Sequence, residues 1–305
     1  MSRTIVVGAA QLGPIARADS REVVIKRMIA LLEKAARRGC DLVVYPELAL
    51  TTFFPRWFME DQAEVDSFFE SEMPGPETAP LFAKVRELGV AISFGYAEKT
   101  VIDGRVRRFN TSIIVDKTGA IVHRYHKVHL PGHTDNEPWR AFQHLEKRYF
   151  EPGDTFFEPA DCLGGKLGMA ICNDRRWPET YREHALRGTE MVLIGYNTPY
   201  HYPLAPEHDH LQCFHNHLAM QAGAYANGMW VVGVGKAGNE ENCVLIGQSC
   251  IIAPTGEIVA MASTLGDELV THDCDLDRCT EIRANIFNFQ KHRRPEMYPL
   301  LSAPV

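Results

Sequence analysis

The chain has 305 residues, of which 45% are hydrophobic and 23% charged, and its formal net charge at pH 7 is -7. This composition is typical of one large or two modest globular domains and excludes the disordered class. The negative charge argues against a nucleic-acid or anionic-membrane partner, because binding to phosphates needs a basic face.

The eight cysteines follow no recurring interval. The closest pair, Cys274 and Cys279, has the wrong spacing for a zinc knuckle and no second pair to complete one. Disulfide frameworks are typical of small secreted chains, so we expect reduced thiols in a cytoplasmic protein. The N-terminal apolar run stops at Gln11, too short for a signal peptide, and no stretch approaches the roughly 20 apolar residues of a membrane span.

In chain order, a predicted strand at 5–11 is followed by a predicted helix that starts at Asp19. Asp19 and Glu22 resemble a capping box, apolar residues recur at helical spacing as far as Ala35, and Gly39 is placed to end the helix. The compact apolar strand DLVVY comes next. The same helix–glycine–strand unit recurs with helices at 78–89, 178–188 and 215–228 and strands at 90–96, 189–197 and 229–235.

Two hairpin signals, with turns at 117–119 and 254–256, follow the second and fourth units. Strands this uniformly apolar are normally covered by helices on both faces of their sheet. The order helix–strand, helix–strand, hairpin therefore occurs twice, before and after about residue 150. We expect one α/β domain over 1–305, built from two similar halves, with a tail at 281–305 that packs on the body or on a partner subunit.

Three predicted strand ends carry reactive groups, and sites in open α/β sheets gather at the carboxyl ends of strands. Glu47 follows DLVVYP, Lys127 ends AIVHRYHK, and Cys172 ends KLGMAIC. A carboxylate, an ammonium and a thiol form a set for acyl transfer, as base, oxyanion stabiliser and nucleophile. Taken singly, each has a simpler explanation: a packed core cysteine, a solvated loop carboxylate and a strand-edge charge. Their combination favours catalysis.

These residues also resemble a known family. Glu47 in YPE, Lys127 in HKVHLP and Cys172 in ICNDRRWPE look like the Glu–Lys–Cys set of the nitrilase superfamily, the carbon–nitrogen hydrolases, and the similarity covers nearly the whole chain. The resemblance implies an α/β four-layer α-β-β-α sandwich, homodimers or homotetramers, and no cofactor. Within the superfamily, CNDRRWPE and HLEKRYFEPGD resemble the branch that hydrolyses N-carbamoyl-D-amino acids.

The resemblance implies that Glu47 takes the thiol proton while Cys172 attacks the carbamoyl carbon. Lys127 and a main-chain N–H near the cysteine would stabilise the oxyanion, and such donors are each worth about 3–4 kcal/mol. Glu146 in HLEKR, which alone would be typical of a solvated helix, becomes a second carboxylate that keeps Lys127 charged. The neighbouring His144 would help to bind substrate, although a lone histidine is more often structural.

Two arginines follow the cysteine, and a guanidinium can hold a carboxylate with two hydrogen bonds. We therefore expect at least one of Arg175 and Arg176 to bind a substrate carboxylate while Cys172 meets the carbamoyl group. The simpler explanation is a structural ion pair with Glu179 or Glu183. The resemblance also implies that three further polar residues line the substrate pocket: Asn173, Asn197 and Thr198.

Other functions stay open at this point. A metal-dependent amidohydrolase is one, because EHDHLQCFHNH holds four histidines near Asp209. The chain lacks an HExxH signature, however, and histidine pairs two residues apart do not face each other on a helix. Another amidase of the superfamily, β-ureidopropionase-like or aliphatic, and a catalytically silent binding protein are the remaining alternatives. The handedness of the substrate depends on the resemblance alone.

Overall fold

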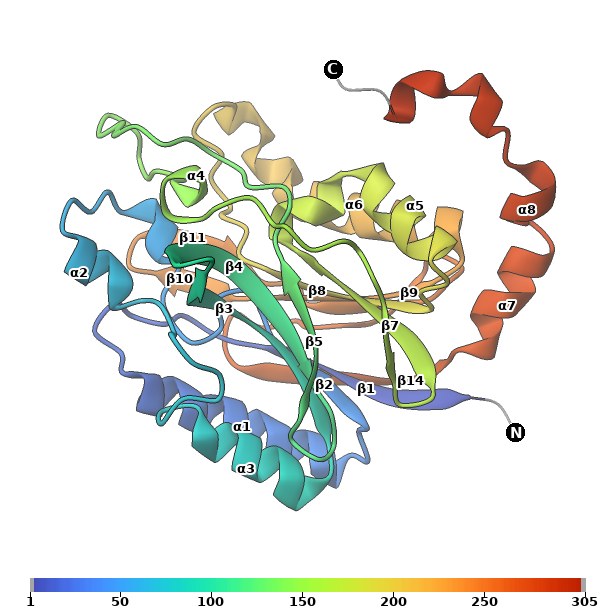
Figure 1. Ribbon diagram of the computed structural model, residues 1–305, viewed down its shortest axis with the longest axis horizontal. Coiled ribbons are helices and arrows are strands. Elements are labelled where there is room, and N and C mark those ends of the chain that lie inside the picture. The colour runs from blue at the N-terminus through green and yellow to red at the C-terminus, as the bar shows by residue number, and fades with distance from the viewer. Residues whose placement is uncertain (1–2, 303–305) are drawn as a thin grey trace.

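The structure, a computed structural model that describes residues 3–302, consists of two six-stranded sheets packed face to face between two layers of helices. Helices α1 (Arg21–Arg37) and α3 (Ala79–Leu88) cover one outer face, and α5 (Pro178–Leu186) and α6 (Gln212–Asn227) cover the other (Figure 1). The predicted α-β-β-α sandwich is confirmed.

Each half of the chain builds one sheet in the same strand order. Strands β1, β2 and β3 run parallel and continue into the antiparallel strands β4 and β5, while β7, β8 and β9 run parallel and continue into β12 and β13. The first sheet, in the order β14-β1-β2-β3-β4-β5, consists of Glu268–Asp275, Thr4–Gln11, Leu42–Val44, Ala91–Ile102, Arg105–Val115 and Ile121–His126. The second, in the order β13-β12-β9-β8-β7-β6, consists of Ile258–Met261, Cys250–Ile252, Trp230–Gly235, Met191–Tyr196, Gly165–Ile171 and Ala160–Cys162. The two similar halves are thus confirmed, although β14 crosses from the end of the chain to pair with β1.

Strand β2 shows why every residue of such a strand is apolar. Leu42 and Val44 point into the core between the two sheets, whereas Val43 points into the core beneath α1 and α3. Successive side chains of a strand face opposite sides, so every position of β2 is buried. Burying each such side chain contributes about 1.5–3 kcal/mol, which ties the strand to both layers.

The start of α1 differs from the prediction. Ser20, not Asp19, is the N-cap, and its hydroxyl accepts a hydrogen bond from the Val23 amide at 3.4 Å. The Asp19 carboxylate instead accepts from the Ala16 amide at 2.8 Å and so closes the preceding turn. Two adjacent residues with capping side chains compete for this position, and spacing alone does not decide between them.

Shorter elements connect the layers, and the last of them form the tail. Phe287 packs edge-on against Tyr225 of α6 at 5.1 Å, and the Arg182 guanidinium of α5 lies over the Phe289 ring at 4.1 Å. Helix α7 begins at Asp277 and so runs across the predicted start of the tail at 281. Packing against a partner subunit stays a prediction. The connecting elements are η1 (Phe54–Arg56), α2 (Gln62–Asp66), α4 (Glu146–Tyr149), η2 (Cys172–Arg176), η3 (Pro206–Leu211), β10 (Ala237–Glu240), β11 (Cys243–Ile246), α7 (Asp277–Ala284), α8 (Phe289–His292), η4 (Pro295–Met297) and η5 (Pro299–Ser302).

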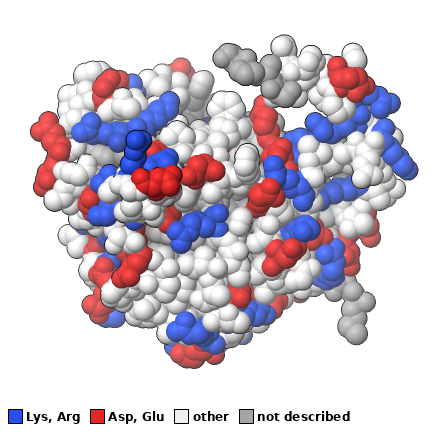
Figure 2. Space-filling view, in the orientation of Figure 1, with Lys and Arg blue, Asp and Glu red and all other residues white. Residues whose placement is uncertain are grey.

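Basic and acidic side chains are interspersed over the face of the molecule shown in Figure 2. Within residues 3–302, no helix combines the length and the apolar character needed to cross a membrane. All eight cysteines fall in this range, and each is a free thiol. The expected lack of a nucleic-acid partner stays a prediction.

Gly195 of β8 lies close to the backbone of the first half of the chain, and it supplies a test of the sheet packing. A Cβ atom at this position would lie 2.4 Å from the Glu47 amide nitrogen and 2.8 Å from the Pro46 carbonyl carbon. Because backbone must move to admit it, Gly195→Ala is expected to lower the free energy of unfolding by about 1–3 kcal/mol. Gly266→Ala, whose Cβ meets open space, is the matched control, with a change below about 0.5 kcal/mol. Urea denaturation measures both, and equal stabilities would contradict this packing.

Candidate active site

Four strand ends converge at one place between the sheets. Lys127, Cys172 and Asn197 directly follow β5, β7 and β8, and Glu47 lies in the loop after β2. Glu146 opens the short helix α4. Hydrogen bonds connect the Glu47 carboxylate to Lys127 and to Asn197, so residues that are far apart in sequence share one site. The structure therefore places Glu47, Lys127 and Cys172 at one site, as expected from the sequence; Cys172 contacts the same Asn197 that binds Glu47.

Lys127 lies between two carboxylates. Its Nζ is 2.7 Å from Glu47 Oε1 and 2.5 Å from Glu146 Oε2, and all three side chains are fully buried. Burial disfavours the ammonium, but the charges of Glu146 and Glu47 outweigh it and raise the pKa of Lys127. The lysine therefore stays charged at neutral pH and can offer a fixed positive charge to an oxyanion.

Two asparagines hold the Glu47 carboxylate in place. Oε1 accepts from Asn110 Nδ2 at 2.8 Å, and Oε2 accepts from the Asn197 amide at 2.9 Å, while the Asn197 side-chain amide donates to the Glu47 main-chain oxygen at 2.9 Å. Asn110 lies on β4, and its main-chain oxygen also accepts from the Lys127 amide. Sequence reasoning missed Asn110, because RFNTSIIV holds other polar residues and nothing in the sequence singles out this amide.

Cys172 stands at a strained bend. Its φ is 47°, in the left-handed region that side chains other than glycine rarely adopt, and its Sγ lies 3.6 Å from the Asn197 main-chain oxygen. Burial and the Glu47 charge raise the pKa of the thiol, although Lys127 and Arg175 oppose the shift. The thiol is therefore protonated in the resting protein, and an attack by sulfur needs a base such as Glu47.

Asp174 ties the cysteine bend to the segment that carries the lysine. Its Oδ2 accepts from the Ile171 amide at 2.9 Å and from the Tyr125 hydroxyl at 2.8 Å, and its Oδ1 accepts from the His129 amide at 2.9 Å. These bonds connect η2 to the residues on either side of Lys127. Sequence reasoning missed Asp174, Tyr125 and His129, because their roles depend on the packing of β5 against the second sheet.

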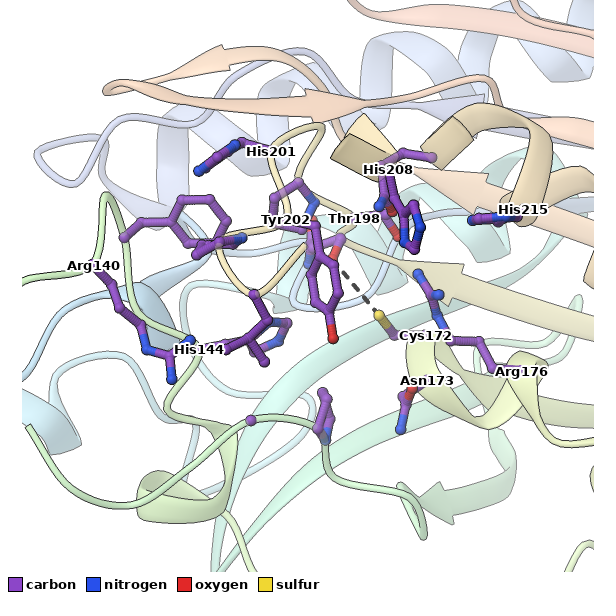
Figure 3. Close-up of a pocket in the computed structure, with 18 of the residues that line it drawn as sticks. Arg140, His144, Cys172, Asn173, Arg176, Thr198, His201, Tyr202, His208 and His215 are labelled. Carbon is purple, nitrogen blue, oxygen red and sulfur yellow. Dashed lines mark hydrogen bonds between the residues drawn. The ribbon is translucent and has the colours of Figure 1, made fainter. Parts of the chain in front are cut away.

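A cavity of about 380 Å³ opens in front of the cysteine. Figure 3 shows Cys172, Asn173 and Arg176 on one wall and Arg140 and His144 on the facing wall. The buried Lys127 is not part of this lining. Of the residues predicted to bind substrate, those that line the cavity are His144, Asn173, Arg176, Asn197 and Thr198.

Arg175 does not line this cavity, contrary to the expectation for a carboxylate-binding residue. Only 1% of it is exposed, and its guanidinium donates to Cys172 O at 2.5 Å, to Thr198 Oγ1 at 2.7 Å and to Asn216 Oδ1 at 2.9 Å. The turn η2 is a 3₁₀ helix, in which residues three apart lie on the same side, so Arg175 falls beneath Cys172.

The exposed side chain of Arg176 lines the cavity, and its guanidinium has no hydrogen bond or ion pair with any residue of the described chain. Arg176 therefore forms no ion pair with Glu179 or Glu183, the simpler explanation considered from the sequence. The Glu183 carboxylate binds Arg187 instead, at 2.7 Å. Desolvation by the cavity wall and the nearby Arg175 charge lower the pKa of Arg176 to about 10. It remains a cation at neutral pH, free to bind an anion.

The remaining predicted pocket residues are each anchored by a protein contact. His144 Nε2 lies 3.1 Å from Glu146 Oε1, and Asn173 Nδ2 donates to the His129 main-chain oxygen at 3.2 Å. Thr198 accepts from Arg175. The cavity wall is thus connected directly to the buried groups behind it.

The histidine-rich segment does not form a cluster of ligands. His208 and His215 line the cavity with their ring centroids 6.3 Å apart, Asp209 pairs with His201 at 2.7 Å, and His217 faces the Gln248 main-chain oxygen. Over residues 3–302, the structure brings together no group of three or more His, Cys, Asp or Glu side chains that could hold a metal ion.

Comparisons with known proteins agree with this architecture. A family model described as carbon-nitrogen hydrolase matches residues 6–284. A nitrilase from Pyrococcus abyssi is 32% identical over 88% of this chain and 90% of its own, and an N-carbamoylputrescine amidase from Solanum lycopersicum is 29% identical over 89% and 87%. The crystal structure of a carbon-nitrogen hydrolase from Helicobacter pylori superimposes with a TM-score of 0.84 at 26% identity, covering 99% of each chain.

The opposing charges around Cys172 predict how its reactivity depends on pH. Because the Glu47 carboxylate raises the pKa of the thiol, Glu47→Gln should lower the pH at which Cys172 reacts with iodoacetamide. A shift of about one unit corresponds to about tenfold faster alkylation near pH 7. Peptide mass spectrometry separates Cys172 from the other seven cysteines. Glu146→Gln, which removes a charge with a weaker influence on the thiol, should produce a smaller shift in the same direction. An unchanged profile in Glu47→Gln would contradict the coupling.

Proposed function

The chain belongs to the carbon–nitrogen hydrolase family and is an enzyme that acts on amides, and we propose that it hydrolyses N-carbamoyl-D-amino acids. The products would be the D-amino acid, ammonia and carbon dioxide. The covalent intermediate would form on Cys172.

The charge of the cavity carries this proposal. Its described lining includes two arginines and five histidines but no aspartate or glutamate. Arg140 is neutralised by Glu137, whereas Arg176 is an unpaired cation on the same wall as Cys172. A substrate with a carboxylate near its reacting carbonyl would satisfy that cation with charge-assisted hydrogen bonds.

This charge separates the candidates within the family. The substrate named for the tomato relative, N-carbamoylputrescine, carries the same reacting group but ends in a cationic amine. A cation in this cavity would lie against Arg176 with no carboxylate of the described lining to receive it. Nitriles and simple aliphatic amides would leave Arg176 unpaired. A β-ureidopropionase-like substrate remains the second candidate, because its carboxylate lies only one carbon farther from the carbamoyl group.

The buried groups suggest the order of the reaction. Glu47 takes the thiol proton as Cys172 Sγ bonds to the carbamoyl carbon, and Lys127, with a main-chain N–H near the cysteine, stabilises the oxyanion. Glu47 then gives its proton to the departing ammonia and next activates a water molecule, which cleaves the thioester-like intermediate. The released carbamic acid loses carbon dioxide and leaves the amino acid.

Two parts of the proposal rest on resemblance alone. The D series follows from CNDRRWPE and HLEKRYFEPGD, which resemble the branch that acts on that series. Assembly into a homodimer or homotetramer follows from the superfamily. Neither is carried by the geometry of the cavity.

The substrate class can be tested by ammonia release from a panel of compounds. We expect N-carbamoyl-D-amino acids to give the highest kcat/KM, with N-carbamoyl-L- and N-carbamoyl-β-amino acids, N-carbamoylputrescine, simple amides and nitriles at least about tenfold lower. Cys172→Ala and prior treatment with iodoacetamide should abolish release, and a chelator should leave it unchanged. A preference for a compound without a carboxylate would overturn the substrate assignment while the family stands.

Arg176→Ala tests the carboxylate contact directly. Hydrogen bonds to a charged group contribute about 1.5–3 kcal/mol, so KM for the N-carbamoyl amino acid should rise by about 10- to 150-fold with little change in kcat. An N-alkylurea of the same length, which lacks the carboxylate, is the matched substrate, and its KM should not change. Equal effects on both compounds would show that Arg176 does not bind the carboxylate.

A further inference from the structure

Arg175 is a buried cation with only neutral partners. Its hydrogen bonds to oxygen end on a carbonyl, a hydroxyl and a side-chain amide, and it forms no ion pair with an acidic residue within 3–302. The ring of Tyr196 packs against the guanidinium with 4.7 Å between Cζ and the ring centroid. An isolated charge in such surroundings is costly, because neutral dipoles replace only part of its hydration. The charge therefore needs an explanation.

The sulfur of Cys172, which lies next to Arg175, explains the buried charge. Arg175 Nη1 lies 3.7 Å from Cys172 Sγ and 2.5 Å from Cys172 O, so one guanidinium nitrogen contacts both the sulfur and the main-chain oxygen of the cysteine. The bond to the carbonyl also supports the left-handed backbone of Cys172. The guanidinium itself is not among the groups that line the cavity in front of the cysteine.

We propose that Arg175 is a catalytic residue that holds Cys172 in its strained conformation and stabilises the thiolate formed there. Asn216 and Thr198 are positioning residues that aim the guanidinium at the sulfur. This inference deepens the proposed function and rests on its cysteine nucleophile, although not on the identity of the substrate.

Forming the thiolate moves a charge within the site and creates none. Before reaction, the carboxylates of Glu47 and Glu146 match the cations of Lys127 and Arg175, and the thiol is neutral. When the S–H bond breaks and an O–H bond forms on Glu47, the negative charge moves from the carboxylate to the sulfur, and the sum does not change. The charge leaves a position beside Lys127 for one that Arg175 also contacts. Arg175 therefore lowers the free energy of the thiolate relative to the resting thiol.

Arg175→Met removes the charge but keeps most of the side-chain volume. The pH midpoint for alkylation of Cys172 by iodoacetamide should rise by at least about one unit, which makes the reaction at least about tenfold slower near pH 7. The kcat for the best substrate should fall by at least the same factor, with KM within about threefold. Arg175→Lys, which restores a cation without the fork, should recover part of both losses.

Asn216→Asp keeps Arg175 but adds a negative charge beside its guanidinium, which tests the same electrostatic effect without removing the arginine. A carboxylate at this position would pair with Arg175 Nε, which now donates to Asn216 at 2.9 Å, and should raise the alkylation midpoint. Asn216→Ala, which removes the anchor without adding charge, is the matched control and should shift the midpoint less. Asn216→Asp decides the question if Arg175→Met does not fold.

Two outcomes would overturn the inference. One is an Arg175→Met protein with a raised KM and an unchanged alkylation profile, which would make Arg175 a substrate ligand. The other is an Asn216→Asp protein whose profile equals that of the wild type. Alkylation needs no substrate, so a wrong substrate assignment would leave this test intact. The absence of any Cys172 requirement for ammonia release would instead defeat the proposed function itself.

Discussion

The buried ammonium of Lys127 is the interaction on which the rest of the site depends. A charge taken out of water costs several kcal/mol unless an opposite charge lies close to it, and here two carboxylates do so, at 2.7 and 2.5 Å. Those carboxylates come from the loop after β2 and from α4, while the lysine follows β5. Keeping the three side chains together therefore fixes the positions of three separate segments of the chain, next to the cavity that Cys172 lines.

The face-to-face packing of the sheets is at the same time the geometry of the site. The first half of the chain supplies Lys127 and its carboxylates, and the second half supplies Cys172 and Asn197. Bonds from Asn197 to Glu47 and from Tyr125 to Asp174 cross between the halves, beside the apolar core that the two sheets share. A shift of one sheet against the other would disturb both the core and the distance between Glu47 and Cys172.

The sequence predicted what local patterns determine. Helices and buried strands followed from spacing, and the reactive residues followed from their places at strand ends. Contacts that depend on pairing were missed: Asn110 reaches Glu47 because β4 pairs with β5 in a register that sets Thr111 opposite His126. One asparagine among the polar residues of β4 does not reveal such a register, because the alternation of side chains indicates only which face it occupies.

The two adjacent arginines show the same limit and its functional consequence. In sequence they are equivalent, but in a 3₁₀ turn successive residues differ in direction by a third of a turn, so Arg175 lies under the cysteine and Arg176 faces the cavity. A substrate carboxylate and a thiolate close together would repel each other. One cation beside each of them offsets that repulsion. In the proposed function, the pair of arginines would thus allow an anionic substrate to approach a nucleophile that becomes anionic as it reacts.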